Sequence, residues 1–208
     1  MTEKHLGLTD YESVWHDMRS FVDNRASDSV DQVWITEHKP VFTQGTSCAD
    51  VPDKQARHIP VVKTDRGGQI TYHGPGQLII YPLLDIKRLG LGPKRLVAML
   101  QQVVIDALSE WGIRSHVKAG APGVYVNDKK IAALGLRIRR GCCYHGLSFN
   151  HSVDLAPFSW IDPCGYPDQA VSRLVDMTGT VSKVDCLTVL LRQLNRIIAE
   201  SESTPQHL

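Results

Sequence analysis

The chain has 208 residues, 42% of them hydrophobic, and a formal net charge of +1. This length suits one domain with a sizeable core, and the near-neutral charge excludes a global field that attracts nucleic acid or anionic membranes. Apolar runs stay well short of the ~20 residues of a membrane span, and the first residues lack the basic-then-apolar order of a secretory signal.

The N-terminal region predicts a helix followed by short strands. Thr9 and Glu12 have the spacing of a capping box, and an apolar stripe at helical spacing follows as far as Val22. Residues 32–38 then read as a strand, and residues 40–45 as a short extended segment that ends at a glycine.

The middle of the chain predicts a buried strand and a long helix. Residues 77–86 form a continuous apolar run, which is typical of a strand buried on both faces. Pro93 suits the first turn of a helix, apolar residues continue at helical spacing to Trp111, and Gly112 has the position of a C-terminal cap.

From residue 122 to residue 153 the apolar pattern changes to period two. Residues 123–126 and 129–138 flank Asn127-Asp128, which predicts a hairpin, and residues 144–153 alternate again. A last apolar stripe predicts a helix after Asp185, followed by a frayed tail over residues 201–208. Helices at both ends and in the middle, with hairpin-linked strands between them, predict one α+β domain over residues 1–208 with a mixed sheet.

The five cysteines are odd in number and include no C-x-x-C pair, which favours reduced thiols and a cytoplasmic location over a disulfide framework. Cys142, Cys143 and His145 suggest a metal site, but their spacing fits no standard zinc motif. Adjacent strand residues also point to opposite faces, so we expect at least one of these two thiols to fill the core.

The segment DRGGQITYHGPGQ, residues 65–77, concentrates four glycines before the predicted buried strand. Glycines adopt positive φ and let another molecule approach the main chain, while Arg66 suits an anion or a carbonyl group. A β-turn with a glycine bulge is the alternative. The spacing matches neither a Walker loop nor G-x-G-x-x-G before a helix, so it does not predict nucleotide phosphate binding.

Two further residues are candidates for catalysis. Cys164 lies in IDPCGYPD, where flanking proline and glycine favour an accessible sulfur; it is nucleophilic only as a thiolate, and an inert cysteine fits the loop equally well. Strand alternation sends Lys129 and Lys130 to opposite faces, so one of them points inward. An inward ammonium beside a thiol favours the thiolate, and the neutral amine can carry protons.

Four segments together resemble the lipoyl(octanoyl) transferase family: RGGQITYHGPGQLIIYPL, APGVYV, KKIAALGLRIRRGCCYHGL and DPCGY. The resemblance extends over roughly residues 30–170. It implies the catalytic fold of biotin and lipoate protein ligases, with an acyl tunnel in a mixed sheet flanked by helices. It also implies octanoyl transfer, with no metal, ATP or other cofactor, from acyl carrier protein to a lysine of lipoyl domains. Those domains belong to the 2-oxoacid dehydrogenase E2 subunits and the glycine cleavage H protein.

The resemblance assigns roles to individual residues. Cys164 matches the family's nucleophile, and Lys130 matches the lysine that tunes it. Backbone N–H groups near Gly146 to Ser148 are then candidates to stabilise the oxyanion, and Lys130 or His73 to accept the proton of the attacking amine. The substrate-contacting segments match Arg66, Gly67, Gly68, Gln69, Ile70, Thr71, Tyr72, His73, Ala133, Leu134, Gly135, Gly146, Leu147 and Ser148.

The chain departs from the family pattern at three places. HVKAG precedes A-P-G where an acidic residue is expected, Cys143 replaces a usual serine, and Ala132-Ala133 replace a Cys-Ser-like pair. These changes bear on the width of the acyl pocket and on chain-length preference.

Acyl carrier proteins are acidic, so the resemblance implies a local basic surface for docking on a monomeric enzyme. The candidates are Arg137, Arg139, Arg140, Lys87, Arg88, Lys94 and Arg95. Three other functions compete: an ATP-dependent lipoate or biotin ligase, a non-catalytic module that binds a carrier protein or a lipid-like ligand, and a cysteine hydrolase.

Overall fold

The computed structural model describes residues 1–48, 58–161 and 170–203. A seven-stranded sheet with the order β1-β2-β6-β10-β9-β8-β7 forms its centre. β1 runs parallel to β2 and the other neighbours pair antiparallel, so the sheet is mixed, as predicted. The strands are β1 (Thr2–Thr9), β2 (Gln32–His38), β6 (Gln77–Leu83), β10 (Cys142–Asn150), β9 (Lys129–Arg139), β8 (Ala121–Val126) and β7 (His116–Lys118).

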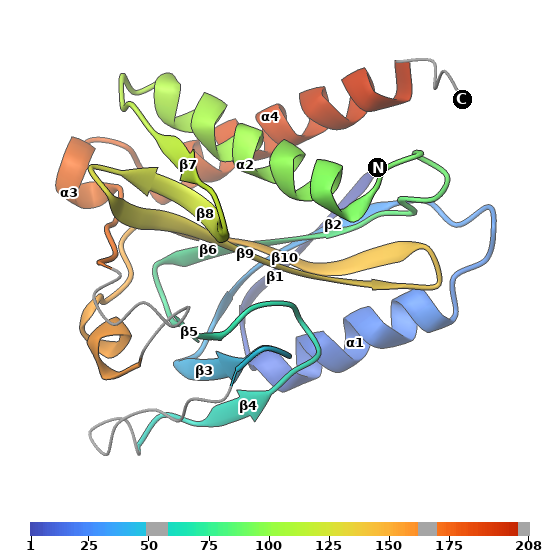
Figure 1. The fold of residues 1–208 in the computed structure, drawn as a ribbon, viewed down its shortest axis with the longest axis horizontal. Helices are drawn as coiled ribbons and strands as arrows, with labels where there is room; N and C mark the ends of the chain where they lie inside the picture. The colour runs from blue at the N-terminus through green and yellow to red at the C-terminus, as the bar shows by residue number, and fades with distance from the viewer. Residues whose placement is uncertain (49–57, 162–169, 204–208) are drawn as a thin grey trace.

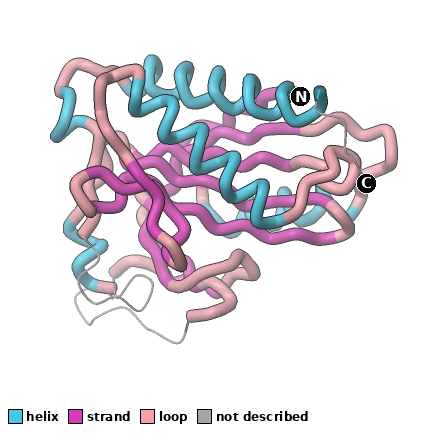
Figure 2. Tube along the Cα trace, turned by 45° about the horizontal axis from the view of Figure 1, so that its top comes forward, coloured by secondary structure: helices cyan, strands magenta, loops and turns pink. Residues whose placement is uncertain are grey.

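Helices cover both faces of this sheet. Figure 1 shows α2 (Pro93–Ser109) and α4 (Lys183–Ser203) together on one face, and α1 (Tyr11–Asp23) on the other. A second sheet of three strands lies on the α1 side, with the order β4 (Val61–Lys63), β3 (Val41–Gln44), β5 (Ile70–His73). The tube in Figure 2 shows the same layers from a second direction. Short helical turns occupy Ala156–Trp160 and, as α3, Val175–Thr178.

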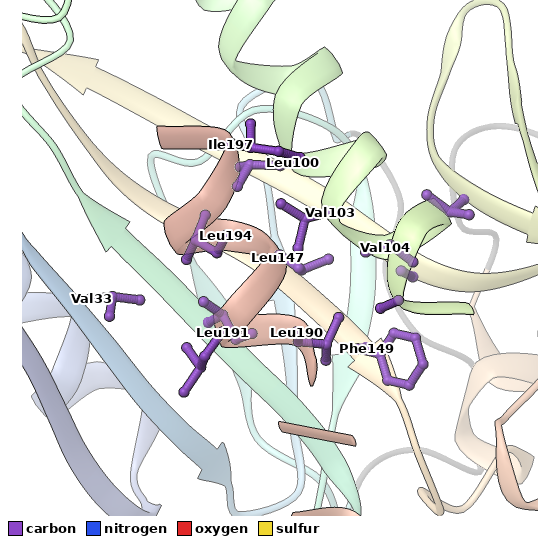
Figure 3. Packing of buried hydrophobic residues seen from close by; sticks show 14 of the residues in the cluster. Val33, Leu100, Val103, Val104, Leu147, Phe149, Leu190, Leu191, Leu194 and Ile197 are labelled. Atoms are coloured by element: carbon purple, nitrogen blue, oxygen red, sulfur yellow. The ribbon is translucent and has the colours of Figure 1, made fainter. Parts of the chain in front are cut away.

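The principal core lies between the large sheet and the α2–α4 pair. Figure 3 shows Val104 of α2 and Leu190 of α4 near Leu147 and Phe149 of β10, and all four side chains are buried. The opposite face of the sheet packs against α1 through a smaller cluster that includes Met18. None of the described helices is both long and apolar enough to cross a membrane.

Several predicted elements are confirmed with small shifts in their ends. The predicted strands at 32–38 and 40–45 correspond to β2 and β3, and the predicted hairpin is formed by β8 and β9. Asn127 and Asp128 have φ of +47° and +63°, the left-handed pair that a tight two-residue turn requires. α2 begins at Pro93 as predicted, and Gly112 has a φ of +70° just beyond its end.

The start of the chain differs from the prediction. Residues 2–9 form β1, an edge strand that the sequence pattern did not reveal. The Thr9–Glu12 capping box is wrong: Thr9 ends β1, and its hydroxyl lies 2.8 Å from that of Thr36. α1 begins at Tyr11 after Asp10, whose side chain makes no capping hydrogen bond.

The C-terminal helix is longer than predicted at both ends. α4 begins at Lys183, before Asp185, and continues to Ser203. α4 thus extends into the first residues of the predicted frayed tail, while residues 204–208 lie outside the described part of the chain.

Candidate active site

A cavity of about 500 Å³ lies among the loop before β5, β9 and β10. Almost all of the predicted substrate-binding residues line it: Arg66, Gly67, Gly68, Gln69, Ile70, Thr71, His73, Ala133, Leu134, Gly135, Gly146, Leu147 and Ser148. Tyr72 is absent from this wall because its ring is buried against Phe42 and Phe158. The structure thus gathers three segments that are far apart in the sequence at one cavity.

Glycines allow the loop to lie directly against the sheet. The Gly67 N–H donates to the carbonyl of Leu136 on β9 at 3.0 Å. A Cβ at Gly135 would lie 3.1 Å from the carbonyl oxygen of Gly67. Gly135 and Gly146 are register partners on β9 and β10, and a Cβ at Gly146 would collide with the Ile80 carbonyl. The glycines therefore serve close packing around the cavity.

Arg66 fastens the loop to β3. Its Nε donates to Thr43 Oγ1 at 3.1 Å, its Nη2 to the Thr43 carbonyl at 2.5 Å, and its Nη1 to the Gly67 carbonyl at 3.0 Å. Because these bonds use much of the buried guanidinium, Arg66 positions the main chain of the loop more than it offers an anion site.

His73 is held neutral by its neighbours. Gln77 donates from Nε2 to Asn150 at 2.8 Å, so its Oε1 accepts from His73 Nδ1 at 2.7 Å. The other ring nitrogen then accepts from the Thr43 hydroxyl at 3.3 Å. Burial lowers the pKa of His73 to about 3. With both nitrogens engaged and low basicity, His73 is a poor candidate for the proton acceptor that the sequence suggested.

Lys130 is the inward lysine. It is only 6% exposed and lines the cavity, whereas Lys129 is exposed, so the predicted alternation is confirmed. A Cβ at Gly123, in the A-P-G segment, would lie 3.0 Å from Lys130 Cε. The Lys130 main chain pairs with a later segment: its N–H donates to the Ala170 carbonyl, and its carbonyl accepts from Ser172 N–H, both at 2.9 Å.

Cys164 lies outside the described residues, so its relation to Lys130 stays a prediction. The neighbouring cysteine pair behaves as expected from strand alternation. Cys142 packs in the α1 cluster and Cys143 in the opposite core. Burial raises the pKa of Cys142, and it raises the pKa of Cys143 and of Cys186 to about 12, so these three thiols are weak nucleophiles.

The sequence analysis missed a polar network at one end of the cavity. Asp65 accepts from His145 Nε2 at 2.9 Å, from Trp15 Nε1 at 2.8 Å and from the Tyr144 hydroxyl. Although burial raises the pKa of Asp65, these three hydrogen bonds outweigh burial and hold its pKa below the ordinary value. The network is therefore built on an ionised carboxylate.

Tyr11 completes this network. Its hydroxyl lies 3.2 Å from His145 Nδ1, and its ring stacks on those of His145 and His73 with centroids 6.4 and 5.7 Å apart. Burial lowers the pKa of His145 and raises that of Tyr11, so both rings are neutral. In the sequence Tyr11 is one residue of an apolar helical stripe, and His145, beside two cysteines, suggests only a metal ligand.

Two other expectations change. Leu147 and Ser148 have register partners on both β9 and β6, so the sheet already engages their main chain, which weighs against them as oxyanion donors.

In the predicted docking surface, two arginines are bonded to Asp23. Arg139 Nε donates to the Asp23 carboxylate at 2.6 Å, and Arg140 Nη1 donates to the Asp23 main-chain carbonyl at 2.9 Å. Arg88 pairs with Asp31. Arg137 is exposed at the cavity.

Comparisons with known proteins agree with this architecture. The family model of the lipoyl protein ligase A/B catalytic domain matches residues 10–195. The chain is 51% identical over 194 residues to an octanoyltransferase of Shewanella sp. (strain W3-18-1), covering 92% of this chain and 89% of that protein. It is 48% identical over 201 residues to one from Chromobacterium violaceum, covering 97% of each.

Solved structures share the fold at low identity. A lipoate-protein ligase A bound with ATP superposes with a TM-score of 0.75 at 14% identity, covering 96% of this chain and 86% of that one. A biotin protein ligase from Aquifex aeolicus in complex with biotin and ATP superposes with a TM-score of 0.65 at 15% identity, covering 98% and 72%. The fold predicted from the resemblance is therefore confirmed.

Proposed function

The chain belongs to the lipoyl protein ligase A/B catalytic-domain family and is an acyltransferase of the octanoyltransferase kind, and we propose that it works through a thioester on Cys164. In this proposal residues 1–208 form one catalytic domain, active as a monomer in the reducing cytoplasm. Its octanoyl donor is acyl carrier protein, and its acceptors are lysines of the lipoyl domains of 2-oxoacid dehydrogenases and of the glycine cleavage H protein.

The observation that carries the proposal is the buried Lys130 at the cavity, bonded through its main chain to residues 170–172. Ala170 follows Cys164 by six residues, which span at most about 20 Å of chain. Ile161, three residues before Cys164, packs in the same cluster as the cavity-lining Phe158. The described residues on either side of Cys164 thus contact residues that line this cavity. An ammonium near the thiol favours the thiolate.

Two half-reactions follow from these groups. The Cys164 thiolate attacks the thioester carbonyl carbon, the new C–S bond forms, and the carrier thiolate leaves with a proton from the Lys130 ammonium. The acceptor amine then attacks the acyl-enzyme, its N–C bond forms, the Cys164–acyl bond breaks, and the Lys130 amine takes the released proton. Such a scheme predicts ping-pong kinetics.

The cavity suits an acyl chain. Leu134, Leu136, Ile138 and Val97 contribute apolar side chains to its wall. Burying the methylenes of an octanoyl group there is worth about 5 kcal/mol at ~0.8 kcal/mol per methylene. Of the seven cations predicted to dock an acidic carrier, Lys87, Lys94, Arg95 and Arg137 are exposed and take no part in the ion pairs and hydrogen bonds described above.

The decisive experiment offers two acyl donors to the purified protein and a lipoyl domain. We expect acyl transfer from octanoyl-acyl carrier protein without ATP, and none from free octanoate with ATP. The reverse pattern would identify an ATP-dependent ligase. Binding without transfer would identify a non-catalytic module, and release of octanoate would identify a hydrolase.

A matched pair of variants ties the activity to the site. Lys130→Ala removes the buried ammonium, whereas Lys129→Ala removes its exposed neighbour on the same strand. We expect only the first variant to lose transfer.

A further inference from the structure

His145 has an unusual backbone for a residue inside a strand. Its φ is +58°, in the left-handed region that favours glycine. The other described non-glycine residues with positive φ, Asn127, Asp128 and Arg140, lie in turns. Strain of this kind persists only where surrounding contacts hold it, and it concentrates at functional sites. The strained backbone therefore marks His145 as a candidate functional residue.

Contacts on three sides fix the His145 ring. The ionised Asp65 can only accept, so Nε2 of His145 carries the proton and donates to it at 2.9 Å. Nδ1 then accepts from the Tyr11 hydroxyl at 3.2 Å. The ring also stacks on Tyr144 with centroids 4.9 Å apart. His145 and Tyr11 both line the cavity, so this locked pair presents a rigid surface to whatever enters.

The position of this pair matches the length of the acyl chain. Lys130 Cε lies next to Gly123, whose register partner on β9 is Ala133. His145 is the register partner of Leu136, three residues farther along the same strand. Three strand residues span about 10 Å. An extended eight-carbon chain, with bonds of about 1.5 Å, is also on the order of 10 Å long.

Lys130, Ala133, Leu136 and His145 all line the same cavity. Gly135 and Gly146 are register partners on β9 and β10, and they line the cavity with main chain alone. Ile79, which packs on the α1 side of the sheet, and Ile70 supply apolar surface to this cavity. An acyl chain whose thioester lies at the Lys130 side-chain nitrogen and which follows β9 therefore reaches the His145–Tyr11 pair with its methyl end.

We propose that His145, backed by Tyr11, closes the acyl cavity and limits the length of the chain that the enzyme transfers. The inference rests on the proposed function, because it places the reacting thioester at Lys130. Rigid packing makes the limit steric, because a His145 ring that is hydrogen-bonded to Asp65 does not move aside for additional methylenes. Longer chains must then displace the ring and lose its hydrogen bonds to both partners.

The test replaces His145 by glycine, which removes the ring and also relieves the positive φ, so the backbone is favoured in the variant. Asn127→Gly, at φ +47° in the exposed β8–β9 turn, is the matched control. Transfer rates are measured from octanoyl-, decanoyl- and dodecanoyl-acyl carrier protein to a lipoyl domain. We expect His145→Gly to raise the decanoyl-to-octanoyl rate ratio at least tenfold, and the control to leave it unchanged.

Several results would separate failure of this inference from failure of the proposed function. If His145→Gly transfers acyl groups with an unchanged decanoyl-to-octanoyl rate ratio, His145 does not limit chain length. Wild-type protein that transfers no octanoyl group would instead overturn the proposed function. If His145→Gly is inactive, the affinities of both proteins for octanoate and dodecanoate give the same comparison without catalysis. An affinity ratio equal to that of the wild type would also overturn the proposal.

Discussion

Lowering the pH from 7.5 to 5.5 should destabilise the fold by about 2.7 kcal/mol through His38 and His73 alone. Burial lowers the pKa of His38 to about 4 and that of His73 to about 3, from an ordinary value of 6.5. Between these pH values the unfolded chain takes up a proton at each site and the folded chain does not. Stability is therefore complete above pH 6.5 and lost as the pH falls. Each histidine contributes about 1.4 kcal/mol over this interval.

His145 adds a loss of the same sign, because burial lowers its pKa as well. The assay is urea denaturation at pH 7.5, 6.5 and 5.5, followed by tryptophan fluorescence. His73→Gln should reduce the pH-dependent loss by about 1.4 kcal/mol. His5→Gln, on the exposed edge strand, changes the histidine count without touching the buried cluster and serves as the control. Equal stability at pH 7.5 and 5.5, or an undiminished loss in His73→Gln, would show that the buried neutral histidines do not cause the loss of stability in acid.

Three further predictions concern the cavity. Lys130→Ala should lower the rate of octanoyl transfer at least ~100-fold, the usual worth of a positioned proton carrier, with Lys129→Ala near wild type in the same assay. Gly123→Ala places a Cβ 2.7 Å from the Ala132 carbonyl oxygen and 3.0 Å from Lys130 Cε, so it should shift β8 against β9, displace the Lys130 side chain and reduce kcat more than the affinity for acyl carrier protein; equal effects on both would contradict this. Asp65→Ala removes the acceptor that holds the proton on His145 Nε2, so ¹⁵N NMR should show a share of the Nδ1-protonated tautomer, and a spectrum of the Nε2 tautomer alone would show that Asp65 does not fix it.

Local patterns in the sequence were sufficient for the elements whose stability is local. Asn127-Asp128 dictated the β8–β9 turn, and proline followed by an apolar stripe dictated α2. β1 has no apolar alternation because most of its residues are exposed, and it is held by main-chain pairing with β2. The capping box failed because β1 reaches Thr9, whose hydroxyl is engaged by Thr36 instead. Both errors come from a long-range pairing that no window of sequence contains.

The same distinction applies to the cavity. Its glycine-rich wall and the inward Lys130 followed from residue types and alternation within single segments. The network at the other end joins Tyr11, Asp65 and His145, which are separated by 54 and 80 positions and meet only when α1 and the loop before β5 pack on β10. An aromatic in an apolar stripe and a histidine beside two cysteines each had a simpler local interpretation. Their functional meaning depends on the backbone strain and burial that the fold creates.

In the proposed mechanism Cys164 carries the octanoyl group between donor and acceptor. The most direct test of this step is intact and peptide mass spectrometry after incubation with octanoyl-acyl carrier protein in the absence of ATP. We predict a hydroxylamine-labile octanoyl adduct on the peptide that contains Cys164, which disappears when a lipoyl domain is added. Transfer without an adduct, or an adduct on Cys142 or Cys143, would contradict the account.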